Sequence, residues 1–142
     1  MQKGFNLADL NVAKADVGVP MAVLNPKTSE PLVFEDEQGS LQPVTITLLG
    51  AESGVVRAER RVQVNRRFRR GLAQASKITA EETEAEALTL LVKQTVAWQG
   101  VALGDDLLEC TEANVRRVYT EFPWIRQQVD TFVNDISNYL GN

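Results

Sequence analysis

The chain contains 142 residues, of which 44% are hydrophobic and 24% charged, and its formal net charge at pH 7 is −4. This length and composition are typical of one folded domain and exclude a chain that is disordered throughout. Strictly apolar runs such as 90–92 are only a few residues long, which excludes a membrane-spanning helix, and residues 1–11 lack the pattern of a secretory signal.

The first third of the chain predicts a loose arm followed by short strands. Residues 1–20 are weakly periodic and are interrupted by glycine and proline, which predicts a flexible N-terminal arm. Residues 21–49 contain three short apolar stretches separated by turn-forming segments, at 21–24, 32–34 and 44–49. The last stretch alternates apolar residues with threonine, as a half-buried strand does. We expect a small antiparallel β meander here.

Residues 51–142 predict about four helices. Apolar residues recur at helical spacing and predict a long helix over 51–74, with Val55, Ala58, Val62, Phe68 and Leu72 at that spacing and Asn65 in the middle. Thr79 is a suitable N-cap for a second helix, whose apolar stripe continues to Val96 and ends at Trp98. Thr111 and Pro123 begin two further helices. The order of elements predicts one α+β domain over 21–142, β-rich at 21–49 and helical afterwards.

Residues suited to catalysis or metal binding are scarce. The chain has no histidine, the commonest general acid or base and metal ligand, so its single Cys110 has no imidazole to activate it. Phosphate-binding glycine loops and a nucleophile elbow are absent from the sequence, and Asp105, Asp106 and Glu109 lack the ligand alternation of a calcium loop. We therefore expect a non-catalytic binding protein without cofactor or metal.

The predicted helix over 51–74 is strongly basic. Eight basic and two acidic residues give residues 51–77 a charge of +6, which leaves −10 for the rest of the chain. Such a cluster can neutralise nucleic-acid phosphates, meet an acidic protein partner, or pair with the glutamates at 81–86 if the two helices fold back on each other. We prefer the last interpretation and expect no nucleic-acid binding, because the chain is acidic overall. Four of these residues are candidate protein contacts: Arg60, Arg61, Arg67 and Arg70.

The last predicted helix is the second candidate contact surface. Its apolar arc is wider than one seam requires, and it comprises Ile125, Val129, Phe132, Val133, Ile136 and Leu140. We expect the two C-terminal helices to pack as a hairpin on the second helix, with Phe132 in the core. The other side of the arc, with Trp124, Ile125 and Val129, should then meet a partner or a second copy of the chain.

The order of parts from residue 89 to 142 resembles the tail assembly chaperones and related small tail-morphogenesis proteins of long-tailed bacteriophages. The matching segments are VAWQG, an acidic turn, LLECTEAN and FPWIRQQV, at 96–100, 104–106, 107–114 and 122–129. The segment PVTITLLG at 43–50, followed by an arginine-rich helix, is also similar to such proteins. These motifs are short and helical, and they bring no catalytic residue with them.

The resemblance implies a function, a location and partners. A tail assembly chaperone binds the tape measure protein, keeps its long helices soluble and helps to recruit tail tube subunits in the cytoplasm of the bacterial host. Such proteins leave the finished particle and are often also made in a longer, frameshifted form. The alternative is a structural virion component, such as a minor tail or head-tail connector protein.

Overall fold

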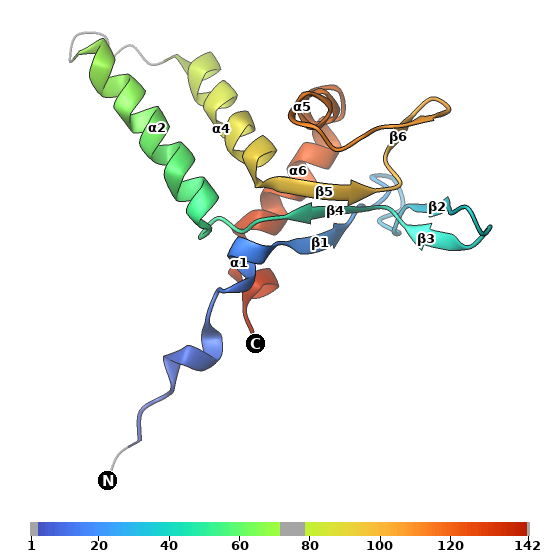
Figure 1. Cartoon of the computed structure of the whole chain (residues 1–142), viewed down its shortest axis with the longest axis horizontal. Coiled ribbons are helices and arrows are strands. Elements are labelled where there is room, and N and C mark those ends of the chain that lie inside the picture. The colour runs from blue at the N-terminus through green and yellow to red at the C-terminus, as the bar shows by residue number, and fades with distance from the viewer. Residues whose placement is uncertain (1–2, 72–78, 142) are drawn as a thin grey trace.

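The computed structural model describes residues 3–71 and 79–141, and it has the predicted α+β architecture, with most strands near the N-terminus and helices after them (Figure 1). Its central element is a three-stranded antiparallel sheet in the order β1-β4-β5. These strands are β1 (Val19–Ala22), β4 (Thr45–Leu48) and β5 (Thr95–Gln99). The sheet therefore joins three segments that are far apart in sequence.

One face of the sheet carries the hydrophobic core. In β4, Ile46 and Leu48 are fully buried, whereas Thr45 and Thr47, which alternate with them, are only half-buried, as the predicted alternation requires. The pairing places Met21 of β1 opposite Ile46, and Ile46 opposite Trp98 of β5. Burial of this apolar face is the main source of the domain's stability.

Two small hairpins extend the sheet region. The first pairs β2 (Val33–Glu35) with β3 (Leu41–Pro43), and the second pairs β6 (Ala102–Leu103) with β7 (Asp106–Leu107). The predicted strands at 21–24, 32–34 and 44–49 overlap β1, β2 and β4, whereas β3, β6 and β7 were missed. Strands of two or three residues are too short to show a periodicity of their own.

Three helices cover the buried face of the sheet. They are α4 (Ala80–Gln94), α5 (Glu112–Glu121) and α6 (Pro123–Asn134), followed by the 3-10 turn η2 (Ile136–Tyr139). Thr79 and Thr111 cap α4 and α5 through their side chains, and Pro123 is the first residue of α6, as predicted. The three helices and the sheet share one core, built from Met21, Val23, Ile46, Leu48, Leu91, Val92, Val115, Val118, Tyr119, Val129 and Val133.

The second predicted helix is too long. It ends at Gln94, and Thr95–Gln99 forms β5 with Val96 exposed. The backbone N–H of Leu49 donates to the carbonyl oxygen of Gln94 at 2.7 Å, and the Gln94 side chain donates to the carbonyl oxygen of Leu49 at 3.0 Å. Pairing with β4 therefore overrides the helical periodicity, which cannot report a partner from another part of the chain.

The segment 1–20, predicted as an arm, instead joins the fold at its second half. The short turns η1 (Leu7–Leu10) and α1 (Lys14–Val17) precede β1, and residues 3–10 are exposed and extend away from the body in Figure 1. Ala15, by contrast, is buried, and its carbonyl oxygen accepts from the N–H of Gly50 at 2.9 Å. The ordered domain therefore begins near Lys14.

Candidate protein-binding site

The helix α2 (Gly54–Arg70) stands away from the sheet beside α4 (Figure 1). Its first turn is fixed by two side chains, because Ser53 Oγ accepts from the N–H of Val56 and Asp16 Oδ1 accepts from the N–H of Gly54 at 2.8 Å. Acceptors at these positions satisfy free amides and match the positive end of the helix dipole. The N-terminal segment thus anchors the base of α2.

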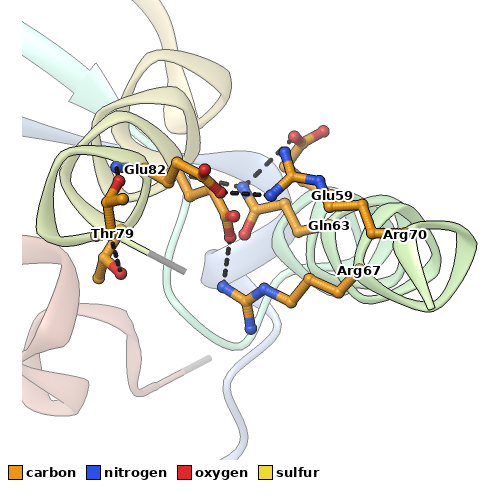
Figure 2. Close-up of polar contacts among 8 residues, drawn as sticks. Glu59, Gln63, Arg67, Arg70, Thr79 and Glu82 are labelled. Carbon is orange, nitrogen blue, oxygen red and sulfur yellow. Dashed lines mark hydrogen bonds and ion pairs between the residues drawn. The ribbon is translucent and has the colours of Figure 1, made fainter. Parts of the chain in front are cut away.

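The inner face of α2 meets α4 through polar side chains (Figure 2). Gln63 donates to the carbonyl oxygen of Glu86 at 3.2 Å and to the Glu59 carboxylate at 3.4 Å. Arg67 pairs with Glu86 at 2.6 Å, and Arg70 pairs with Glu82 at 2.5 Å. Val56 and Gln63 are the buried residues of this helix. Polar contacts therefore hold most of the α2–α4 hairpin.

The space between the two helices is itself polar. A cavity of about 170 Å³ opens there, lined by Glu59, Gln63, Arg66, Arg70, Glu82, Ala85, Glu86 and Thr89. On the same helix, Arg67 Nε is buried without a hydrogen-bond partner among the described atoms. A buried polar atom without a hydrogen-bond partner lowers stability, because it loses its hydration without compensation. The hairpin is thus less tightly packed than the core.

The apolar residues that predicted this helix are exposed. Val55, Ala58, Val62 and Asn65 form an outer stripe on the side of α2 away from α4, and Val55 and Val62 are 41% and 49% exposed. Phe68, from the same prediction, is 76% exposed, and Leu72 lies outside the described residues. Periodicity identifies an apolar face but does not say what covers it. Here α4 packs on the Gln63 side of the helix, so the apolar stripe stays exposed.

The preferred interpretation of the arginines accounts for only two of them. Arg67 and Arg70 pair with glutamates of α4, whereas Glu84 pairs with Arg126 of α6. Within residues 3–71 and 79–141, the other five arginines of α2 are exposed and make no ion pair: Arg57, Arg60, Arg61, Arg66 and Arg69. Arginines without ion pairs that lie beside exposed apolar side chains define a surface that favours an acidic partner.

Arg60 and Arg61 were both predicted contacts, and the structure separates them. Arg61 lies about 100° from Val62 around the helix axis and borders the outer stripe, whereas Arg60 lies about 160° from Val62, on the other side of the helix. Arg67 and Arg70 face α4 and are less available to a partner. Of the four predicted contacts, only Arg61 therefore lies beside the outer stripe and is free of an ion pair within the described ranges. Arg66 was missed, although its spacing from Val62 already showed it beside the stripe.

The predicted contacts on α6 divide in the same way. Val129 is fully buried in the core and cannot contact a partner, so this prediction was wrong. Ile125 is half-buried and lines an apolar cavity of about 190 Å³ between the sheet and the second hairpin. Trp124 is half-buried, packs edge-on against Phe122 at 6.4 Å and borders both this cavity and a wider groove. Only Trp124 and Ile125 remain contact candidates.

The wider groove, of about 600 Å³, lies between α6 and β1 with the residues that follow it. Gln128 closes one part of it, because its side-chain amide accepts from the N–H of Leu24 at 2.9 Å and donates to the carbonyl oxygen of Leu24 at 2.8 Å. Phe132 also lines the groove and contacts Tyr139 edge-on at 5.8 Å. Phe132 is therefore half-buried at the core boundary, not in the core interior as predicted.

The core also contains two tyrosines with shifted acidity. Burial raises the pKa of the Tyr119 phenol well above its usual value, and the phenol shares a 2.6 Å hydrogen bond with the Thr95 hydroxyl. Burial likewise raises the pKa of Tyr139 to about 12, and its hydroxyl donates to the carbonyl oxygen of Leu48. Both phenols are neutral at physiological pH and tie α5 and η2 to the sheet.

Neither a protein-family model, nor a curated protein, nor a solved structure matches this chain. Across residues 3–71 and 79–141, no helix has the length and apolar character needed to cross a membrane. In that part of the chain, acidic and cysteine side chains do not gather in threes as a metal site requires.

Proposed function

We propose that this chain is a non-catalytic tail assembly chaperone of a long-tailed bacteriophage, which binds the tape measure protein and helps to recruit tail tube subunits. The proposal rests on the resemblance of residues 89–142 to that family and on the character of the α2 surface. A protein that keeps long helices soluble needs an accessible apolar surface with a charged border, and it needs no cofactor.

One observation carries this proposal: the outer stripe of α2 is apolar, exposed and bordered by arginines without acidic partners in the described structure. A surface helix ordinarily turns its apolar stripe toward the core. In α2 the apolar stripe faces outward. Among the described positions, the helix buries only one apolar residue, Val56, which does not belong to that stripe. Such an arrangement is typical of a surface that is covered by a partner.

Co-expression with the tape measure protein tests the proposal. We expect the tape measure protein to become soluble and to co-purify with this chain. Val62→Asp places a charge in the outer stripe and should abolish that effect without unfolding the protein, because Val62 is exposed. Val17→Asp makes the same change at an exposed valine outside α2 and should have no effect. A tape measure protein that stays equally insoluble with the chain contradicts the proposal.

A chaperone is also distinguished from a structural virion component by its absence from finished particles. Mass spectrometry of purified particles should detect the tape measure protein but not this chain at a stoichiometric copy number. The gene should lie between those of the tail tube and the tape measure proteins. Stoichiometric copies in the particle would favour the structural alternative.

Nucleic-acid binding is a second candidate function, favoured by the five unpaired arginines of α2 and by the exposed ring of Phe68 between Arg67 and Arg69. Arginines that neutralise phosphates give strongly salt-dependent binding, and an aromatic ring can stack on a base. Binding to duplex and single-stranded DNA at low and moderate salt separates the two functions. We expect no binding even at low salt, because the whole chain carries −4.

A further inference from the structure

The outer stripe of α2 has the spacing of a coiled-coil seam. Val55, Ala58, Val62 and Asn65 follow one another at intervals of three, four and three residues, and all four are exposed. This alternation keeps successive side chains on one side of a helix and is the pattern that another helix packs against. The 17 residues of α2 extend about 25 Å, so they offer about two heptads to a partner.

Arginines flank this seam at positions that would face the charged side chains of a partner helix. In a coiled coil, charged residues usually flank the seam on either side, one position before or after a seam residue. On α2, Arg61 directly precedes the seam residue Val62, and Arg66 directly follows the seam residue Asn65. Both are exposed and make no ion pair within the described ranges. The flanking Glu59 is engaged by Gln63 of the same helix. The two arginines and Glu59 together give the flanking positions a net charge of +1, and Glu59 is the one already held by its own helix.

We propose that the outer stripe of α2 binds an amphipathic α-helix whose apolar seam is flanked by acidic side chains. This inference deepens the proposed function, because it names the chemistry of the segment that the same surface recognises. The partner's acidic residues pair with Arg61 and Arg66, and a polar residue opposite Asn65 fixes the register.

Charge excludes the simplest self-pairing through this stripe. Two α2 helices from two copies of the chain would bring Arg61 and Arg66 against arginines of the second copy, and like charges across a seam oppose association. Nucleic acid is a poorer occupant, since phosphates contact the arginines but leave Val55, Ala58 and Val62 exposed to water. An acidic amphipathic helix satisfies both the apolar and the charged parts of the surface.

The test uses two synthetic helical peptides of three heptads that share one apolar seam with a single asparagine. One carries glutamate at every flanking position and the other carries lysine. Binding of each fluorescently labelled peptide to the full chain is measured by anisotropy at low and moderate salt. We expect the glutamate peptide to bind at least ten-fold more tightly than the lysine peptide, and to weaken as salt rises.

Charge reversal identifies the contact. The double variant Arg61→Glu and Arg66→Glu should weaken the glutamate peptide at least ten-fold and bind the lysine peptide more tightly than the original chain does. The matched control, Arg57→Glu and Arg60→Glu, makes the same charge change on α2 outside the flanking positions and should change affinity less than three-fold. Circular dichroism of each variant confirms that α2 remains helical.

Several results would overturn the inference: equal binding of both peptides, equal loss in the two double variants, or tighter binding of duplex DNA than of the glutamate peptide. Failure here is distinguishable from failure of the proposed function. If neither peptide binds while the tape measure protein still becomes soluble, the helix-binding inference is wrong and the chaperone function stands. If the glutamate peptide binds but the tape measure protein does not, the chaperone function is wrong and the helix-binding inference stands.

Discussion

Substitution of Gly50 by alanine tests the packing of the N-terminal segment against the core. A Cβ atom on Gly50 would lie 2.8 Å from the Cβ of Ala15 and 3.1 Å from Cγ of the Tyr139 ring. Both distances are shorter than ordinary carbon contacts, which are about 3.5–4.0 Å. The substitution therefore inserts a methyl group where α1, β4 and η2 already meet.

The expected cost is that of overpacking, about 1–3 kcal/mol of unfolding free energy. For a chain of this size, that cost lowers the midpoint of thermal unfolding by roughly 3–12 °C. Differential scanning calorimetry and urea unfolding measure it directly. Since α1 supplies the nearer contact, the companion change Ala15→Gly should relieve part of the strain when the two are combined.

A double-mutant cycle tests whether Ala15 packs against Gly50. We expect Gly50→Ala to cost at least about 0.5 kcal/mol less in the Ala15→Gly background than in the original chain, which is the coupling usual for residues in contact. If the two changes are strictly additive, Ala15 does not pack on Gly50. The strain would then come from the Tyr139 ring alone. If Gly50→Ala has no effect on stability at all, the close approach itself is wrong.

Three further predictions concern the core and the sheet edge. Gly100 has φ +76° and a Cβ there would lie 2.2 Å from the Phe34 ring, so Gly100→Ala should destabilise by about 1–3 kcal/mol; the control Gly39→Ala, at φ +77° with its nearest neighbour at 3.6 Å, should cost less. The raised pKa of Tyr119 favours the protonated phenol in the folded protein, so stability should be unaffected below pH 10 and fall by up to about 1.4 kcal/mol per pH unit above it. Tyr119→Phe should flatten that alkaline slope in urea titrations, and an unchanged slope would contradict the assignment. Gln128→Ala should accelerate amide hydrogen exchange at Leu24, whereas Gln128→Glu, which keeps the acceptor, should preserve most of the protection.

The sequence alone determined the class of the fold and most helix starts. The threonines at 79 and 111 and the proline at 123 begin helices because capping and a fixed φ are local properties that need no partner. The alternation of Val44–Leu49 likewise predicted β4, since one strand's own side chains define its two faces. The basic helix was also visible, because charge is a property of composition.

The tertiary structure alone decided which surfaces are buried. Thr95–Gln99 continues an apolar helical pattern but becomes β5, because β4 supplies hydrogen bonds that no local pattern reveals. Val129 and Val62 both lie in apolar helical stripes, yet one is enclosed by the core and the other faces solvent. Periodicity gives the direction of a side chain relative to its own helix, whereas burial depends on where other elements pack. For α2, the contact of Gln63, Arg67 and Arg70 with α4 left the apolar stripe outward, and this orientation defines the candidate site.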